Sequence, residues 1–313
     1  MIVYTHTETL AQDLGIPAAT LFGVSFHLDR HYRRVTLPKR DGGVRTLCVP
    51  DPILKKIQRR ILRVLLFHRP VSPYATAYRP GVGLRANALP HCGRQCVLQL
   101  DIRQFFDSVR YLQVKEIVFP KEIFSEKLRV LLSCLCYGRD GLPQGAPTSP
   151  AISNLLLRDF DLRVGDWCAA RGIRYTRYCD DLTFSGAFDP KPVIRMVSDA
   201  LWREGFVLNP RKTRFSRSGQ RQTVTGVVVN DRPRLDAARR RALRAELYYC
   251  RRFGVADHLS HIGDPRTPRA YLLSLLGRLD FALSLGAEPQ LAEGRRWVLE
   301  QLKPSKQKEE IDG

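Results

Sequence analysis

Two adjacent carboxylates, Asp180 and Asp181, are the residues of this sequence that point most clearly to chemistry. Neighbouring carboxylates repel one another, so each resists ionisation unless a cation is close by. A pair of Asp residues can also serve simply as a turn. The surrounding residues favour the chemical interpretation, because Tyr175, Tyr178 and Phe184 are apolar enough to bury a pair of strands. Such strands would hold both carboxylates rigidly where they meet.

A third carboxylate, Asp101, ends the apolar segment 97–102, which is typical of a short buried strand. An acid at that position is costly without a partner or a metal ion. Asp107 is the alternative in this segment, but it precedes Ser108 and a helical stretch, so it is better interpreted as a helix N-cap. Three carboxylates on two strands could hold two Mg²⁺ ions roughly 3.5–4 Å apart, which activates a hydroxyl group and stabilises a leaving phosphate.

The elements that must position these residues mix strands with helices. Residues 31–49 are expected to form a hairpin about Asp41-Gly42-Gly43, and residues 173–185 two strands that meet at Cys179-Asp180-Asp181. Helical periodicity is expected in three further segments: 52–67, Ser149 to Arg171, and from Asp236 onward. This mixture predicts an α+β fold rather than a doubly wound sheet.

The composition favours a polyanionic partner. The chain has 313 residues, with 51 Lys and Arg against 31 Asp and Glu, a net charge of +20. Self-repulsion of this size is tolerated most easily where a nucleic acid neutralises it. The sequence contains no run of apolar residues long enough for a membrane span and no secretory signal. Its eight cysteines form no C-x-x-C pair, which favours reduced thiols in a cytoplasmic bacterial protein over a zinc site.

The order of the segments resembles that of a reverse transcriptase. The first palm motif matches at Asp101, the second at LPQGAPTSP (Leu142–Pro150), the third at YCDD (Tyr178–Asp181) and the fourth at EGFVLNPRKT (Glu204–Thr213). Upstream, KRDGGVR (Lys39–Arg45) is similar to the fingers hairpin that meets the incoming triphosphate. The resemblance implies an RNA-directed DNA polymerase with a right-hand fold. Its expected parts are an N-terminal region with fingers at 1–96, a palm at 97–230 and a helical thumb at 231–313.

The same resemblance implies roles for individual residues. Asp101, Asp180 and Asp181 would be the catalytic, metal-binding carboxylates. The implied nucleotide-binding residues are Lys39, Arg45, Phe106, Gln144, Gly145 and Lys212. Phe106 occupies the position where the family places a ring beside the sugar, which would exclude a 2′-hydroxyl. One of Phe105 and Phe106 is expected to belong to the core.

Two short motifs resemble signatures of retron reverse transcriptases. They are NALPH, with Asn87 and His91, and VTG, with Thr225 and Gly226. A retron enzyme would copy its own structured non-coding RNA from dNTPs, starting at an internal 2′-hydroxyl. It would leave a branched hybrid, multicopy single-stranded DNA, with help from the host RNase H. Retrons commonly serve in anti-phage defence with an accessory effector protein. A reverse transcriptase of another bacterial lineage (diversity-generating or intron-type) and a non-catalytic nucleic-acid-binding scaffold are the alternatives.

The predicted thumb begins with a basic, aromatic stripe. At helical spacing, Leu243, Leu247 and Cys250 would form a buried row. A second row would face outward: Arg241, Arg244, Tyr248, Arg251 and Arg252. A row of charges is usually a solvated surface. Because this one has a single sign and includes a Tyr, it favours RNA binding by phosphate contacts and base stacking.

Overall fold

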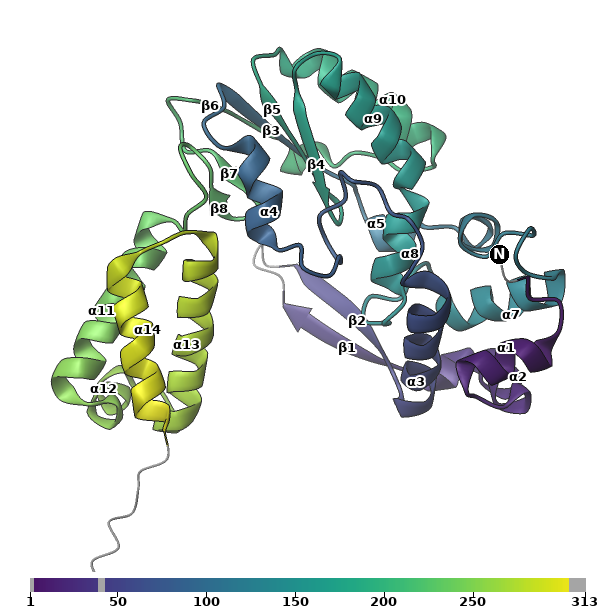
Figure 1. Ribbon diagram of the computed structural model, residues 1–313, viewed down its shortest axis with the longest axis horizontal. Coiled ribbons are helices and arrows are strands. Elements are labelled where there is room, and N and C mark those ends of the chain that lie inside the picture. Colours follow the sequence, from purple (N-terminus) through teal and green to yellow (C-terminus); the bar gives the residue numbers. More distant parts are fainter. Residues whose placement is uncertain (1–2, 39–42, 304–313) are drawn as a thin grey trace, which may run out of the picture. The chain divides into compact units, whose positions relative to one another are not determined.

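The computed structural model describes residues 3–38 and 43–303, and the chain divides into two compact units (Figure 1). Unit 1 comprises Met1–Gly83 and Gln95–Ser216, and unit 2 comprises Leu84–Arg94 and Arg217–Gly313. Helices and antiparallel strands occur together, which confirms the α+β prediction. In the described part of the chain, no helix combines the length and apolar character needed to cross a bilayer.

A four-stranded sheet with strand order β4-β5-β3-β6 lies at the centre of unit 1. Its strands are β3 (Cys96–Asp101), β4 (Arg174–Tyr178), β5 (Asp181–Gly186) and β6 (Arg214–Arg217). β5 runs antiparallel to both β3 and β4. β3 is buried along nearly its whole length, as expected for an interior strand with the apolar sequence CVLQLD. The strands predicted around 97–102 and 173–185 are therefore confirmed.

Helices cover this sheet and complete the core of unit 1. α9 (Arg158–Ala169) packs against β4, and α10 (Pro190–Arg203) packs against α9 (Figure 1). The single helix predicted from Ser149 to Arg171 is wrong. The backbone leaves the helical conformation at Leu157, so α8 (Ser149–Leu156) and α9 are separate helices. Ser149 is the first residue of α8, after Thr148 at the N-cap position, and its hydroxyl donates to the Pro143 carbonyl at 2.9 Å.

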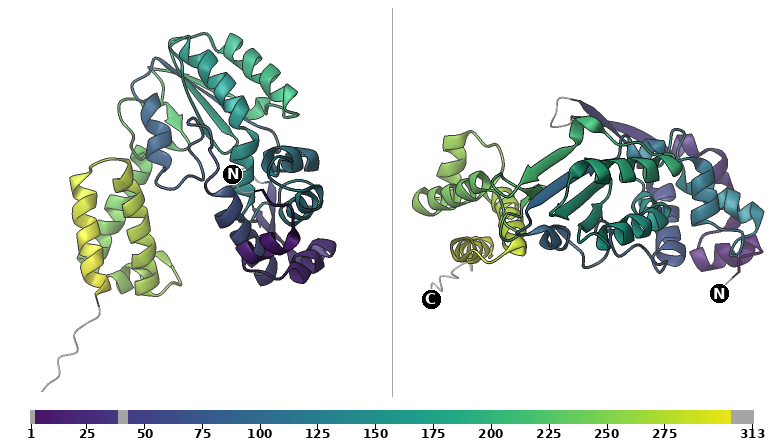
Figure 2. Two further views of the ribbon diagram at one scale, coloured as in Figure 1. Left: turned by 45° about the vertical axis from the view of Figure 1, so that its right-hand side comes forward. Right: turned by 90° about the horizontal axis from the view of Figure 1, so that it is seen from above.

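The remainder of unit 1 begins with two short helices and the predicted hairpin. The antiparallel strands of this hairpin are β1 (Tyr32–Pro38) and β2 (Val44–Pro50). The predicted helix at 52–67 is α3 (Pro52–Ile61), continued by a π-helical turn at Leu62–Leu66. The other helical elements are α1 (Thr7–Leu14), α2 (Ala18–Phe26), Leu28–His31, α5 (Phe105–Ser108), α6 (Tyr111–Gln113), Val114–Val118, α7 (Glu126–Cys136) and Pro210–Lys212. Figure 2 shows the sheet and the helices of this unit from two further directions.

Unit 2 is mostly helical, as predicted from Asp236 onward. Its main elements are α11 (Ala237–Phe253), α12 (Val255–Ile262), α13 (Pro268–Leu285) and α14 (Pro289–Leu302). Asp236 caps α11 by accepting a hydrogen bond from Arg239 N at 3.0 Å. Two segments that precede these helices in the chain belong to the same unit. They are α4 (Leu84–Ala88) with the turn Leu89–His91, and the hairpin of β7 (Thr223–Val224) and β8 (Val227–Val228).

Candidate active site

The turn between β4 and β5 carries the adjacent carboxylates. Register pairs Tyr178 with Asp181, so Cys179 and Asp180 form a two-residue turn. Cys179 has φ +60°, a left-handed conformation that costs free energy in a residue other than glycine. The Asp180 carbonyl accepts a hydrogen bond from Ile102 N at 3.0 Å, which ties the turn to the end of β3. The turn is therefore a constrained support rather than a loose loop.

Asp101 and Asp181 are direct cross-strand partners at the ends of β3 and β5. Asp101 is 4% exposed, and its carboxylate accepts two side-chain hydrogen bonds. Lys212 Nζ donates to Oδ2 at 2.7 Å, and Asn209 Nδ2 donates to Oδ1 at 3.2 Å. This contact raises the pKa of Lys212. The predicted nucleotide-binding lysine thus lies at the carboxylates, and the structure brings residues more than 100 positions apart into one cluster.

The carboxylates of this cluster repel one another. Asp181 is the first residue of β5 and the exposed one in that otherwise buried strand. Desolvation, followed by the charges of Asp180 and Asp101, raises its pKa to about 6. Lys212 acts in the opposite direction but does not cancel the shift. A cluster with this excess of negative charge favours a proton or a cation.

The pKa of Asp181 predicts a pH-dependent affinity for divalent cations. Below pH about 6 a proton competes for this carboxylate, so the affinity should fall about tenfold per pH unit for one competing proton. Titration of the nucleic-acid-free protein with Mn²⁺ or Mg²⁺ by calorimetry between pH about 5 and 7 measures this. An affinity independent of pH across that range would contradict the prediction.

Of the two phenylalanines after β3, one belongs to the core, as expected. Phe105 is 2% exposed and packs on Phe206 with ring centroids 5.4 Å apart. Phe106 is only half-buried, so it is the ring that can face a ligand. The interpretation of Asp107 as an N-cap is wrong, because Gln104 precedes α5 and Asp107 lies inside it with an exposed side chain.

The family resemblance places the Phe106 ring beside the sugar, so replacing it with Ala should open that space and admit ribonucleotides. The measurement is the ratio of ribonucleotide to deoxyribonucleotide incorporation on one template. Phe105→Ala serves as the control: it removes a core ring and should lower stability by about 3–5 kcal/mol without shifting that ratio. Unchanged discrimination in Phe106→Ala would return Phe106 to a packing role.

The LPQG segment meets the fingers hairpin at Gly145. This glycine has φ +123°, and a Cβ there would lie 2.7 Å from the Cys48 carbonyl oxygen of β2. Cys48 N also donates to the Gln144 carbonyl at 2.8 Å. The glycine is thus already required by contact with β2, independently of any approach to a nucleotide. Arg45 lies in β2 opposite Leu37, and Lys39 lies outside the described residues.

A buried ionic network beneath the turn between β4 and β5 was not anticipated from the sequence. Arg177 is completely buried and forms a bidentate pair with Asp161, with Nη2–Oδ2 at 2.6 Å and Nε–Oδ1 at 2.8 Å. Its Nη1 donates to Asn154 Oδ1 at 3.2 Å and to the Cys179 carbonyl at 3.1 Å. Burial would lower the pKa of Arg177, but Asp161 outweighs it and the pKa is raised. A charged donor therefore fixes the left-handed residue that precedes Asp180.

The profile of the reverse transcriptase (RNA-dependent DNA polymerase) family matches residues 37–232, which include the whole carboxylate cluster. The chain belongs to this family. The retron Mx65 reverse transcriptase of Myxococcus xanthus is 37% identical over 284 residues, covering 83% of this chain and 66% of that protein. The retron Ec83 reverse transcriptase of Escherichia coli is 32% identical, covering 67% of this chain and 72% of that protein. A solved telomerase structure from Candida albicans, with an RNA fragment, has 11% identity and a TM-score of 0.46 over 86% of this chain and 66% of that chain.

The family match and the two retron relatives confirm the resemblance to retron reverse transcriptases and the right-hand polymerase fold. The chain spans slightly less than two thirds of the length of the two Myxococcus relatives, Mx65 and Mx162. The family is generally dependent on divalent metal ions. Carboxylate oxygens with excess negative charge suit a hard cation such as Mg²⁺. Among residues 3–38 and 43–303, however, no three Asp, Glu, His or Cys side chains converge closely enough to enclose a metal ion; the ion pair with Lys212 occupies Asp101 instead.

The two retron signatures meet inside unit 2. Asn87 Nδ2 donates to Thr225 Oγ1 at 3.2 Å. Both Asn87 and His91 are completely buried, and burial lowers the pKa of His91 to about 3. Thr225 and Gly226 form the turn of the β7–β8 hairpin, and both have positive φ. The two motifs therefore contact each other in the folded unit. This contact could not be predicted from the sequence, because the motifs lie far apart along the chain.

The expected RNA-binding stripe lies along α11. Leu243, Leu247 and Cys250 are buried as predicted. Four residues of the stripe, all except Arg241, line one hollow of about 420 Å³ between α11 and α14: Arg244, Tyr248, Arg251 and Arg252. Tyr248 is 55% exposed. Two of the arginines have partners on α14, since Arg244 donates to Gln290 at 3.2 Å and Arg251 to Glu293 at 2.9 Å.

Proposed function

We propose that this protein copies its own structured non-coding RNA into branched multicopy single-stranded DNA, starting from the 2′-hydroxyl of an internal guanosine. The observation that carries the polymerase activity is the pairing of Asp101 with Asp181 at adjoining strand ends, with Asp180 beside Asp181 in the tethered turn between β4 and β5. The retron-type product is supported by the similarity to retron enzymes and by the contact between Asn87 and Thr225.

In this proposal the three carboxylates hold two Mg²⁺ ions. When bound, these ions supply charge stabilisation to the attacking hydroxyl and the leaving phosphate. Lys212 exchanges its contact with Asp101 for the phosphates of the incoming dNTP. Phe106 excludes the 2′-hydroxyl of ribonucleotides, and Gln144 and Gly145 line the nucleotide site. Lys39 and Arg45 of the hairpin meet the triphosphate.

The proposed partners follow from the same reaction. The cognate RNA serves as template and primer, and the branched RNA–DNA product stays bound. The host RNase H removes template RNA from the hybrid. An accessory effector protein, held inactive by the enzyme–hybrid complex, would connect the activity to anti-phage defence.

The nucleic acid that co-purifies with the protein tests the retron proposal. We expect DNA joined covalently to RNA, so that ribonuclease treatment shortens the species without releasing all ribonucleotides from the DNA. A debranching enzyme should then separate the two. Unbranched DNA would point to another reverse transcriptase lineage. Absence of DNA synthesis on any annealed RNA template and DNA primer would indicate the non-catalytic scaffold.

The α11 stripe predicts salt-dependent RNA binding. Log affinity should fall with log salt by about 0.7–0.9 per neutralised phosphate. Changing Arg244, Arg251 and Arg252 to Gln should therefore make the slope shallower by roughly two to three units. Tyr248→Ala should instead weaken binding by roughly 1–3 kcal/mol with little change in slope. A triple variant with the wild-type slope would show that the stripe is only a solvated surface.

A further inference from the structure

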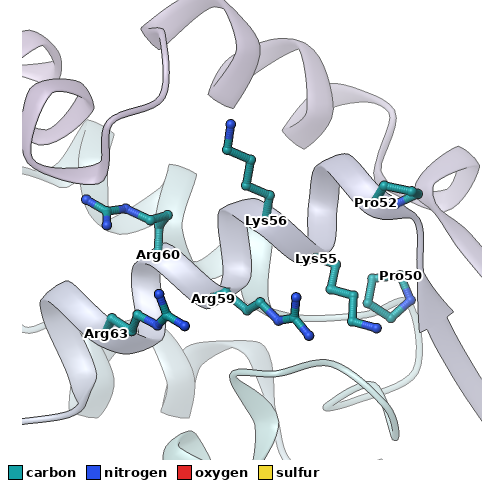
Figure 3. A pocket seen from close by; sticks show the side chains of 7 residues that line it. All are labelled: Pro50, Pro52, Lys55, Lys56, Arg59, Arg60 and Arg63. Carbon is teal, nitrogen blue, oxygen red and sulfur yellow. The ribbon is translucent and has the colours of Figure 1, made fainter. Parts of the chain in front are cut away.

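In unit 1, the outward face of α3 and of the π-helical turn that continues it forms a second concentrated basic surface. Figure 3 shows its five basic side chains, Lys55, Lys56, Arg59, Arg60 and Arg63. Together with Pro50 at the end of β2 and Pro52 at the start of α3, they line a hollow of about 530 Å³ that has no acidic lining residue. Lys55, Arg59 and Arg63 are spaced four residues apart and lie along one side of the helix in Figure 3. Neighbours in this row are about 6 Å apart along a helix axis.

The helix presents this face rigidly. Its opposite face is buried through Leu54, Ile57 and Ile61. The buried Gln58 donates from Nε2 to the Tyr32 hydroxyl at 2.7 Å and to the Leu135 carbonyl at 2.9 Å. These contacts prevent the helix from rolling about its axis. The charged groups on the outer face are therefore preorganised, which lowers the entropy lost when a ligand binds.

Most of these charges have no ion-pair partner among residues 3–38 and 43–303. Arg60 donates to the carbonyl oxygens of Leu14 at 2.7 Å and Asp13 at 2.9 Å, so it holds the C-terminal end of α1 against α3. For Lys55, Lys56, Arg59 and Arg63, the described residues supply no carboxylate within ion-pairing distance. A helix C-terminus favours cations in the last turn, which accounts for Arg59 and Arg60 but not for the two lysines. Like charges at this spacing destabilise a helix, so a ligand of opposite charge is the simpler explanation.

We propose that α3 binds the sugar–phosphate backbone of RNA, as an anchoring surface additional to the α11 stripe. The proposal rests on the proposed function, which supplies the RNA. Evenly spaced cations in a row suit a polymer of phosphates better than a single anion. The hollow has no aromatic side chain on which a base could stack, so the contact is with phosphates and is independent of sequence. Its prolines and alkyl stems also offer no deep apolar pocket of the kind that anchors a protein partner.

The test compares three variants, each with three substitutions, in the full chain. The first changes Lys55, Arg59 and Arg63 to Gln. The second keeps the charge at the same positions, as Lys55→Arg, Arg59→Lys and Arg63→Lys. The third removes the same charge from exposed positions of α10 in the same unit: Lys191, Arg195 and Arg203 to Gln. The probe is a fluorescently labelled RNA hairpin with a single-stranded tail, titrated by anisotropy at several salt concentrations without nucleotides.

We expect the slope of log affinity against log salt to become shallower by roughly two to three units in the first variant alone. Thermal melting of all three variants should match wild type, because every changed side chain is exposed except Lys55, which is only partly buried. A wild-type slope in the first variant would overturn the proposal, and so would an equal change in the α10 variant. Binding of tripolyphosphate that depends on the three α3 residues, with RNA binding unchanged, would overturn it in favour of a small-polyanion site.

Failure of this proposal and failure of the proposed function are distinguishable. If wild-type protein extends a primer on RNA but the first α3 variant binds the hairpin like wild type, only the α3 surface is refuted. If wild-type protein synthesises no DNA, the polymerase assignment fails, whatever the α3 slopes show. If the α3 and α11 stripes contact one RNA together, their effects on the slope should add in the combined variant.

Discussion

Replacing either Asp180 or Asp181 with Asn should reduce DNA synthesis at least about a thousandfold, because charge stabilisation by metal ions is worth several kcal/mol and each 1.36 kcal/mol is about tenfold in rate. Asn keeps the shape of the side chain, so the turn should stay folded. RNA binding should be largely retained, since the basic stripes are untouched. Primer extension under single-turnover conditions, with RNA affinity measured in parallel, separates the two effects.

Asp107→Asn provides a matched control for these variants. Asp107 belongs to the same segment as Asp101, but its side chain is exposed on α5. This variant should polymerise like wild type. Near wild-type activity in Asp180→Asn or Asp181→Asn would refute the catalytic assignment of that residue. In Asp180→Asn, the pKa of Asp181 should also fall toward its ordinary value, because the Asp180 charge contributes to the shift.

The second large effect is expected from Arg177→Met. Removing this side chain leaves the buried Asp161 carboxylate without its bidentate partner, which should cost about 3–5 kcal/mol of folding free energy. The Cys179 carbonyl also loses its donor, so the left-handed turn beside Asp180 becomes less constrained. Urea denaturation followed by circular dichroism, which reports the unfolding of the helices, measures the loss of stability.

A double variant separates stability from positioning. Arg177→Met with Asp161→Leu removes both buried charges, and such replacements are often neutral or stabilising. If Arg177 positions the turn, both the single and the double variant should have a low kcat for DNA synthesis and normal RNA affinity. Only the double variant should regain stability. Recovery of kcat together with stability would show that the network serves folding alone.

The parts of the active site that could be predicted are those with short-range patterns. The apolar segment before Asp101 and the paired apolar residues around Asp180 each define a strand. The β3–β5 register then places Asp101 opposite Asp181. The helix after Ser149 was predicted less well, because the break at Leu157 has no glycine or proline to mark it.

The parts that could not be predicted depend on long-range partners. Arg177 is indistinguishable in the sequence from the exposed arginines around it. Its burial is possible only because Asp161, 16 residues earlier, accepts its hydrogen bonds, and the Tyr175 hydroxyl in turn donates to Asp161. Likewise, the requirement for Gly145 comes from the backbone of β2 at Cys48. A sequence pattern reports which residues alternate or repeat, but not which distant group will neutralise a buried charge.

The packing of α4 against the β7–β8 hairpin has a consequence for how this chain is synthesised. Asn87 precedes its partner Thr225 by 138 positions. At about 5–20 residues per second, roughly 7–28 s pass between the emergence of the two residues from a ribosome. During that time the segments on either side, up to Gly83 and from Gln95 to Ser216, can fold into unit 1. Residues 84–94 meanwhile have no β7–β8 hairpin to pack against, so their apolar surface stays exposed to solvent. Fragments that end before residue 223 should therefore be prone to aggregation, and stalled translation in this interval should expose the same segment to chaperones.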